Sequence, residues 1–579
     1  MVKLKIASRE LFLLLVIIMV GAFLRFYGIN WDQNSHLHPD ERAIVMAVIP
    51  LEFPKTLSRF FSPESTWNPH FFAYGNFPLY LLKISSIALS FFNQYFSSYN
   101  GITILGRFFS AAFDSLTILI IFLLGKSLGG KKAGLLGAFF YSVSVLPIQV
   151  SHFYAVDTIL TFFITLTIYF LISFHKKPTI QRALLIGVFF GVSLATKISA
   201  SVLISAIGVA LAADFFFILR EHYKNLSLLL RHLSSFSKHL AFLIFVISIT
   251  AIFTFLVFEP YAIIDFESFK NQTQLQSRMT KDAFAFPYTL QYVGKIPYFY
   301  ELKNIFLWGQ GPILATLSFV GVIYFTFLAL QKIIAGKNYD KKYAYELILA
   351  AFFWTYFAIV GGFAIGFMRY MLPVYPLLSV FTAIFIYNVI YSKISGLKSP
   401  KFFILYMLFF IFVLIWPLSF INIYKHPNTR MSASNWIYQN IPRGSILAIE
   451  HWDDQIPFGQ PIPYTFLTLP LYDHDSQSKW MEINETLRKT DYIIIASNRL
   501  YVPLQKLTDC EKLKPNPCYK GTAEYYRKLF SGELGFQKVA EFTVFPKIPL
   551  LNIKINDEAA DENFTVFDHP KVMIFKKNY

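Results

Sequence analysis

Long apolar segments separated by short polar ones fill the first three quarters of the chain. Several reach about 20 residues, the length that crosses the hydrocarbon core of a bilayer. The pattern predicts about eleven membrane spans: 10–28, 102–124, 133–149, 157–174, 183–197, 199–218, 240–258, 305–330, 345–366, 370–391 and 402–422. The first lacks the small-residue cleavage site of a signal peptide, so we interpret it as a retained anchor. Residues 1–424 are therefore predicted to form a multi-pass α-helical membrane domain.

Two long polar loops interrupt this domain, at 29–101 and 259–304. Within the first loop, residues 77–96 are apolar enough to form a span. Counting them as a span would reverse the side of every later loop, so we interpret them as an interfacial helix that lies at the outer membrane surface.

From residue 425 onward the hydropathy falls and globular patterns appear. We expect a helix, two buried strands, a charged loop and a last strand, at 431–440, 445–450, 492–496, 556–562 and about 564–575. Residues 425–579 are thus predicted to be a soluble α/β domain. It contains both cysteines, Cys510 and Cys518, which form either a short disulfide or two free thiols.

The charge distribution sets the expected orientation. The net charge is +17, but 1–424 hold 33 Lys and Arg against 17 Asp and Glu, while 425–579 hold 19 against 18. Much of the excess falls on every second loop, including 125–132, 219–239 and 331–344, as expected for cytoplasmic connections. We therefore expect a plasma-membrane protein with its N-terminus inside and its C-terminal domain outside. This topological origin of the charge argues against nucleic acid as a partner.

Ionisable residues gather at the predicted outer surface. Asp40 and Glu41 are adjacent carboxylates just beyond the first span. Ionisable residues cost free energy at a membrane boundary, so their presence there suggests a function. Others fall at the same depth: His152 and Asp157 near the start of the fourth span, Lys197 between the fifth and sixth, and Arg369 and Tyr370 at the tenth. The second long loop adds Glu259, Asp265, Arg278, Tyr292 and Tyr298.

Carboxylates facing cations suit a substrate that carries both a phosphate and a hydroxyl. The carboxylate can take a proton from an attacking hydroxyl, and Arg or Lys can offset the charge of a phosphate leaving group. Simpler roles stay open: Asp157 could stabilise a helix start, and Lys197 and Arg369 could extend toward headgroups. Deeper in the second span, Asp114 is expected to pack against a polar neighbour, and Arg107 is a further phosphate candidate.

An ordered series of motifs runs along most of the chain. It comprises HPDERA, YGNFPLYLL, GRFFSAAFDSLT, SHFYAVDTILTFF, ATKIS, EPYAIIDF, FPYTLQYVGKIPYFYELKNIFLWGQGP, RYMLPVYPLL and TVFDHPKVMIF. The series resembles membrane glycosyltransferases of the GT-C class, family 39, with their protein O-mannosyltransferase and aminoarabinose transferase relatives, in the prokaryotic type.

This resemblance implies a polyprenyl-phosphate-linked monosaccharide donor, used on the outer face. We expect the transfer to invert the anomeric centre. Asp40 matches the acid taken as catalytic base, Glu41 is its neighbour, and Asp157 matches a second acid. Lys197, Arg278 and Arg369 are candidates for the donor phosphate, and His152, Tyr292, Tyr298 and Tyr370 for other substrate contacts. Residues 425–579 do not resemble MIR repeats, so the acceptor is left open between lipid, glycan and protein.

Three alternatives remain at this stage. An oligosaccharyltransferase or glycan ligase of related architecture would hold a divalent cation, Mg or Mn, between Asp40 and Asp157, although the sequence establishes no metal ligand set. A transporter or flippase for a lipid-linked sugar would favour charges at the membrane midplane. A non-catalytic membrane scaffold is the third alternative.

Overall fold

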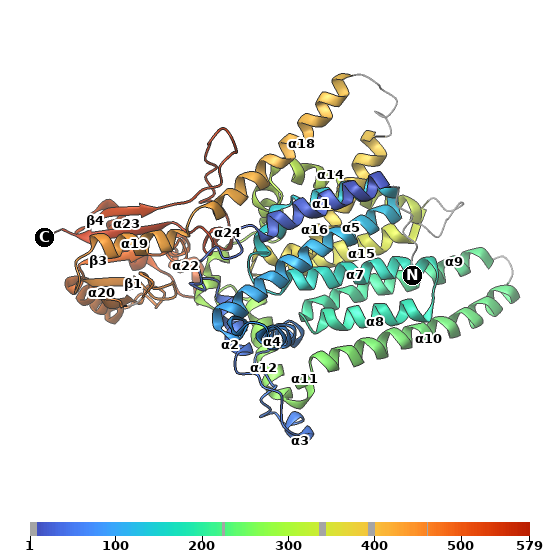
Figure 1. The fold of residues 1–579 in the computed structure, drawn as a ribbon, viewed down its shortest axis with the longest axis horizontal. Helices are drawn as coiled ribbons and strands as arrows, with labels where there is room; N and C mark the ends of the chain where they lie inside the picture. Colours follow the sequence, from blue (N-terminus) through green and yellow to red (C-terminus); the bar gives the residue numbers. More distant parts are fainter. Residues whose placement is uncertain (1–7, 223–225, 335–342, 392–399, 460, 579) are drawn as a thin grey trace.

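The computed structural model describes residues 8–222, 226–334, 343–391, 400–459 and 461–578. A bundle of long helices and a smaller unit built on a β-sheet lie at opposite ends of an elongated molecule (Figure 1). Most of the long helices run along the long axis, and the short helices and loops that carry the site lie at the end of the bundle that faces the sheet.

Each of the eleven predicted spans coincides with a helix. The helices are α1 (Ser8–Phe26), α5 (Tyr99–Ser142), α7 (Asp157–Lys176), α8 (Ile180–Leu194), α9 (Leu203–His222), α10 (Leu226–Phe258), α14 (Pro312–Ile334), α15 (Tyr343–Gly361), α16 (Tyr375–Phe385) with the turns beside it, and α18 (Pro400–Phe420). Helix α5 contains two spans, because Gly130 adopts φ 83° and interrupts the helix between them. Within the described residues, seven helical segments are long and apolar enough to cross a membrane.

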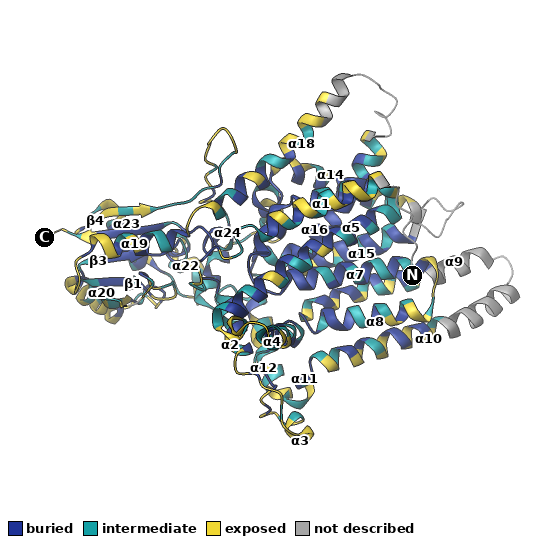
Figure 2. Cartoon of the chain, in the orientation of Figure 1, coloured by how far each residue is buried: buried dark blue, intermediate teal, exposed yellow. Residues whose placement is uncertain are grey.

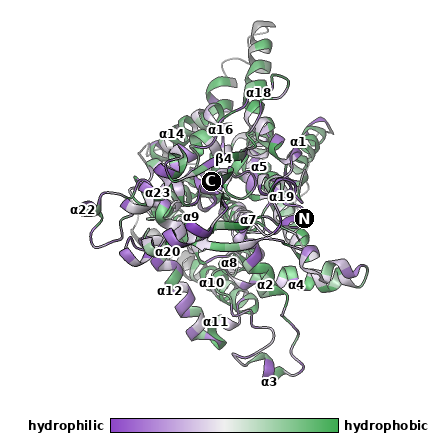
Figure 3. Cartoon of the chain, turned by 90° about the vertical axis from the view of Figure 1, so that its left-hand side faces the viewer, coloured by the Kyte–Doolittle hydropathy of each residue, from purple (hydrophilic) through white to green (hydrophobic). Residues whose placement is uncertain are grey.

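Large apolar side chains also cover the outward faces of these helices. Phe253 of α10, Ile323 of α14 and Ile411 of α18 are each more than half exposed. Figure 2 shows exposed positions along the outer faces of the bundle, and Figure 3 shows that α18 is largely hydrophobic. Such a surface is expected where lipid replaces water. The predicted class, a multi-pass helical membrane protein, is confirmed.

Shorter elements cover the sheet-facing end of the bundle. They are α2 (Pro39–Val48), α3 (Leu57–Phe60), α4 (Asn76–Ser90), α6 (Val145–Val150), α11 (Tyr261–Ile264), α12 (Phe266–Lys281) and α13 (Phe299–Asn304). Helix α4 is seen nearly end-on in Figure 1, so it crosses the direction of the bundle helices. Its Leu79 and Leu82 pack with Ile44 and Val48 of α2. This arrangement agrees with an interfacial helix at 77–96. Parts of the basic loops 219–239 and 331–344 lie outside the described residues.

The C-terminal unit contains a five-stranded mixed sheet in the order β2-β1-β3-β5-β4. The strands are β1 (Ile446–Glu450), β2 (Thr465–Leu469), β3 (Tyr492–Ile495), β4 (Phe536–Phe542) and β5 (Val572–Lys577). Strand β1 is parallel to β2 and β3, and β5 is antiparallel to β3 and β4. The α/β class expected for this region is confirmed.

Alternate side chains of the strands enter two hydrophobic cores. Ile494 packs with Ile437 of α19 (Thr429–Asn440), whereas Ile493 and Ile495 pack with α20 (Gln477–Lys489) and α23 (Lys520–Ser531). Three short helices complete the unit: α21 (Tyr501–Leu504), α22 (Cys510–Leu513) and α24 (Glu562–Thr565). Cys510 and Cys518 form a disulfide across a loop, which settles the alternative left open by the sequence.

The predicted last strand began too early. Asp561 caps α24, with its Oδ1 accepting a hydrogen bond from the backbone N–H of Asn563, so the chain makes a helical turn before β5 begins at Val572. This turn inserts Phe564 among Trp308, Trp416 and Phe420 of the bundle. The sheet is therefore joined to the bundle by an aromatic contact that the alternation of polar and apolar residues did not reveal.

Candidate functional site

Asp40 lies in the first turn of α2. His38 is the N-cap, its Nδ1 accepting the backbone N–H of Glu41 at 3.4 Å, and Pro39 occupies the first helical position. Burial lowers the pKa of His38 to about 3, so the ring is neutral and able to accept this bond. Its ring contacts Phe153 and Phe567, which fixes the start of the helix. The positive end of the helix dipole favours carboxylates at this position.

The two adjacent acids face different surroundings. Glu41 is buried and pairs with Arg107 at 2.6 Å, and Arg107 also pairs with Asp32 at 2.7 Å. The backbone N–H of Tyr154 donates to Glu41 at 3.1 Å. These contacts connect the first outer loop to α5 and to the segment before α7. Glu41 therefore holds the loop in place, and Arg107, which the sequence made a phosphate candidate, is occupied by two carboxylates.

Asp40 instead belongs to a row of four alternating charges. Nη2 of Arg369 lies 2.7 Å from Oδ2 of Asp40, and Nε of Arg369 lies 3.3 Å from Oδ2 of Asp157. The other oxygen of Asp157 accepts a hydrogen bond from Nζ of Lys197 at 2.8 Å. Four segments that are far apart in the sequence thus meet, and their formal charges sum to zero.

Two tyrosines enclose the cationic end of this row. The Lys197 ammonium lies 4.3 Å from the ring centroid of Tyr370 and 5.6 Å from that of Tyr74. The Tyr74 loop lies directly on the turn that carries Lys197, because Gly75 donates its backbone N–H to Thr196. A Cβ at Gly75 would lie 2.0 Å from the carbonyl oxygen of Ala195, so only glycine permits this approach.

The surroundings of Asp40 determine its ionisation. Burial raises its pKa, but the charge of Arg369, with smaller contributions that include Lys197 and a hydrogen bond from Tyr74, outweighs burial and holds the pKa below its usual value. Asp40 is therefore ionised and can accept a proton.

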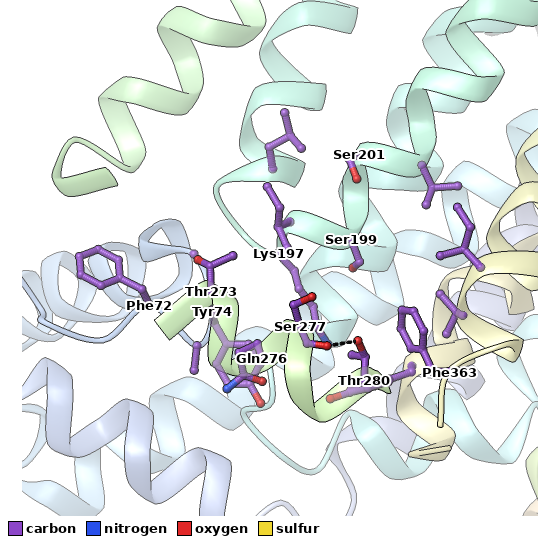
Figure 4. Close-up of a pocket in the computed structure, with 18 of the residues that line it drawn as sticks. Phe72, Tyr74, Lys197, Ser199, Ser201, Thr273, Gln276, Ser277, Thr280 and Phe363 are labelled. Atoms are coloured by element: carbon purple, nitrogen blue, oxygen red, sulfur yellow. Dashed lines mark hydrogen bonds between the residues drawn. The ribbon is translucent and has the colours of Figure 1, made fainter. Parts of the chain in front are cut away.

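A first cavity, which we call the bundle cavity, extends from Lys197 between α8, α10, α12 and α15 (Figure 4). It has a volume of about 480 Å³ and a mostly apolar lining that includes Val202, Phe255, Ile359 and Val360. Two residues of this lining, Ile198 and Ile359, are 56% and 47% exposed. The cavity is therefore open to water-sized molecules rather than filled by side chains.

A second cavity, which we call the interdomain cavity, lies between the bundle and the C-terminal unit and also measures about 480 Å³. It is more polar than the bundle cavity, and the membrane domain and the C-terminal unit both line it. Its polar and aromatic lining residues include Asp40, Arg42, Tyr74, Gln276, Tyr288, Gln291, Arg369, Tyr370, Trp452, Asp453, Asp454, Arg499, Glu562 and Asn563. Ala73, Tyr74, Gln276 and Tyr370 line both cavities, so the two spaces adjoin at the row of charges.

The far wall of the interdomain cavity comes from the carboxyl ends of parallel strands. Trp452 and Asp454 follow β1, and Arg499 follows β3, the edge at which α/β sheets commonly bind ligands. Arg499 pairs with Glu562 at 2.8 Å, while the second Glu562 oxygen is buried without a hydrogen-bond partner. Burial, partly opposed by Arg499, raises the pKa of Glu562 to about 7.

Five of the ten predicted site residues come together at the row of charges: Asp40, Asp157, Lys197, Arg369 and Tyr370. The other five, which include Glu41, lie elsewhere. The ring nitrogens of His152 are bonded to the carbonyls of Ile148 and Tyr27, and Arg278 is exposed on α12 outside both cavity linings.

The two remaining tyrosines also lie outside both linings. Tyr292 is buried against Tyr300 and Phe367, and its hydroxyl accepts a hydrogen bond from Asn563. Tyr298 is 42% exposed and donates to the carbonyl of Ala358.

The sequence analysis did not single out Tyr74, Gln276 or any C-terminal lining residue. A signal existed for Tyr74, which begins the motif YGNFPLYLL, and for Phe567, which lies in the motif TVFDHPKVMIF.

The acid pair does not suit a bridging divalent cation. The Arg369 guanidinium lies between Asp40 and Asp157, and Lys197 occupies the second oxygen of Asp157. Among the described residues, no group of three or more His, Cys, Asp or Glu side chains is arranged to hold a metal ion. The Mg or Mn site that the oligosaccharyltransferase alternative would need is therefore not supported by this arrangement.

The helical bundle, the charged site at its sheet-facing end and the C-terminal sheet together have the fold of membrane glycosyltransferases of the GT-C class. Residues 89–249 match the family model described as dolichyl-phosphate-mannose-protein mannosyltransferase, which agrees with the resemblance seen in the sequence. No curated protein sequence matches the chain.

Two solved structures illustrate the likeness. The archaeal oligosaccharyltransferase AglB from Archaeoglobus fulgidus, in complex with an inhibitory peptide and a dolichol-phosphate, is similar with TM-score 0.50 and 13% identity, over 98% of this chain and 88% of that chain. ArnT from Cupriavidus metallidurans bound to undecaprenyl phosphate has TM-score 0.42 and 12% identity, over 75% of this chain and 73% of that chain.

Proposed function

We propose that the protein transfers a monosaccharide from a polyprenyl-phosphate donor to an acceptor hydroxyl on the outer face of the membrane, with inversion at the anomeric carbon. The observation that carries this proposal is that a mostly apolar cavity in the bundle adjoins a more polar cavity at the row of charges, where Asp40 is ionised. A related fold that binds a dolichol-phosphate and a peptide supports it.

The bundle cavity is the proposed donor site. Its apolar lining suits the first isoprene units of the lipid, and Ile198 and Ile359 mark the side from which the chain enters. The phosphate then lies near Lys197 and Arg369, whose charges offset the negative charge that builds on the leaving group.

The interdomain cavity is the proposed acceptor site. An acceptor hydroxyl next to Asp40 attacks the anomeric carbon; its oxygen forms the new bond as the bond from that carbon to the phosphate oxygen breaks. The hydroxyl proton passes to Asp40, and the electron pair of the broken bond remains on the polyprenyl phosphate. A single displacement inverts the anomeric centre.

An oligosaccharyltransferase is the second candidate, favoured by the fold shared with AglB. It would use the same two cavities with a longer donor glycan. A lipid-linked sugar flippase is disfavoured because the row of charges lies at helix ends rather than in the middle of the spans: on the first turns of α2 and α7, after α8 and before α16.

The decisive experiment uses purified protein in liposomes with a polyprenyl-phosphate monosaccharide radiolabelled in the sugar. Transfer of label to membrane glycolipid, glycan or protein acceptors, with release of polyprenyl phosphate, is the expected result. Uptake of label with a polyprenyl-diphosphate oligosaccharide, and none with the monophosphate donor, would favour the second candidate. Movement of intact donor across the bilayer without cleavage would contradict both.

Filling the bundle cavity is expected to weaken donor use. Ser201 lines this cavity, so Ser201→Trp should raise the donor KM by about tenfold, the scale of a misfit in an apolar pocket, with a smaller change in kcat. The matched control is Ile204→Trp, since Ile204 is 61% exposed and lies outside the lining. Equal donor KM values in the two variants would show that the donor does not bind in this cavity.

The proposal also includes the orientation of the protein in the membrane. The site faces outward if the loops 125–132, 219–239 and 331–344 are cytoplasmic, as their basic residues favour. Single cysteines placed in these loops of a plasma-membrane preparation should react with an impermeant maleimide only after the membrane is opened. Labelling of 125–132 from outside intact cells would reverse this topology.

A further inference from the structure

A hairpin with an apolar tip extends from the C-terminal unit beside the bundle, between β4 and α24. Residues Lys547 and Lys554 form a β-bridge at its base. Backbone hydrogen bonds from Ile548 to Ile553, from Asn552 to Ile548 and from Ile555 to Pro546 close it. These hydrogen bonds give the hairpin a defined shape.

Its tip exposes large apolar side chains. Leu550, Leu551 and Ile553 are 106%, 67% and 52% exposed. Leu550 also adopts φ 67°, a backbone conformation that glycine or asparagine would adopt at less cost. An exposed leucine at a left-handed position costs free energy in water, which indicates that another environment covers it.

The base of the hairpin connects it to the outer end of a membrane span. The backbone N–H of Lys547 donates to the carbonyl of Ser419, in the last turn of α18, at 3.2 Å. Val544 and Ile555 on the two arms pack against the core of the bundle. The tip therefore lies beside the end of α18 and away from the sheet (Figure 1).

The charge of the hairpin agrees with this position. Lys547 and Lys554 flank the tip, and residues 545–555 contain no acid. Apolar side chains that enter the acyl boundary, with lysines level with anionic headgroups, are the usual composition of an interfacial anchor.

We propose that residues 549–553 insert into the interface of the outer lipid leaflet and act as a membrane anchor for the C-terminal unit. The occupant of the apolar tip is lipid, since the bundle that the hairpin adjoins already lies in a bilayer. The anchor fixes the sheet at a second point besides the Phe564 contact, and so holds the wall of the interdomain cavity at a constant height above the membrane. The anchor is independent of the transferase proposal.

Nitroxide labelling of the full chain in lipid nanodiscs tests this anchor. Both native cysteines are in a disulfide, so Leu550→Cys supplies a thiol that a spin label can reach selectively. Collision with dissolved oxygen should exceed collision with a water-soluble nickel chelate for the label at 550. The reverse ratio should hold for Val539→Cys, an exposed position on β4 that serves as the matched control. Leu551→Cys repeats the measurement if the first variant fails to fold.

Two results would overturn the anchor. In the first, labels at 550 and 551 collide more often with the nickel chelate than with oxygen, as the control label at 539 does. The other is strong dipolar broadening between labels at 550, which would show that a second copy of the chain covers the tip. Since this readout involves no sugar donor, failure of the transferase proposal would leave it unchanged.

Discussion

Replacing Asp40 with Asn is expected to slow sugar transfer by at least about a hundredfold, the usual scale for loss of a general base. The amide oxygen can still accept the hydrogen bond from Arg369, which now lies 2.7 Å from the carboxylate, so the site should keep its shape. What the variant loses is a group able to take the acceptor proton. Donor binding should change little, because Asp40 lines the interdomain cavity and not the bundle cavity.

The measurement is kcat and donor KM of purified protein in liposomes. Glu267→Gln is the matched control, since the Glu267 side chain is 74% exposed on α12 and pairs only loosely with Lys270 at 3.7 Å. Its kinetics should match the unmodified chain. Near-normal turnover by Asp40→Asn would refute the base assignment.

Replacing Arg369 with Gln should have a comparable effect, about a hundredfold to a thousandfold, the scale seen when a donor to a developing oxyanion is removed. Two ion pairs are lost together, and Asp40 and Asp157 then lack the charge that lies between them. Arg369→Lys should also be impaired, because one ammonium cannot replace a planar fork that contacts two carboxylates.

The pH dependence of the residual activity distinguishes this role from a structural one. Arg369 is the charge that contributes most to lowering the pKa of Asp40. Without Arg369 the pKa of Asp40 rises, so Asp40 becomes protonated at a higher pH. The acidic limb of the pH–rate profile should therefore shift to higher pH. Arg278→Gln, which removes an exposed arginine outside both cavities, should leave the profile unchanged. Impairment in Arg278→Gln with normal kinetics in Arg369→Gln would place the phosphate elsewhere.

The membrane architecture could be predicted because hydrophobic length is a strong local signal. Residues 77–96 show where length alone is ambiguous: helix α4 ends at Ser90 within this segment, and only the charge of later loops favours a helix that does not cross. The last strand was misplaced because Phe564 packs into the bundle, a contact between distant segments that no local alternation reveals.

The site was partly predictable for a similar reason. A predicted membrane topology gives the depth of a residue in the bilayer but not the direction of its side chain. Asp40 and Glu41 share a depth, yet successive residues on a helix point about 100° apart, and one faces the cavity while the other faces Arg107. The strands before Trp452 and Arg499 could be predicted from the sequence. Their place in the same cavity as Asp40 could not, because that cavity forms between the C-terminal unit and the bundle.

The proposed entry of a lipid donor into the bundle cavity from the bilayer determines in which units the substrate concentration is expressed. A donor that enters past Ile198 and Ile359 reaches the enzyme by diffusion in two dimensions. Its effective concentration is its mole fraction among the surrounding lipids, whereas a water-soluble acceptor would be counted per unit volume. The rate is then subject to surface dilution: added inert phospholipid slows turnover even though the amounts of donor and enzyme in the vessel stay the same.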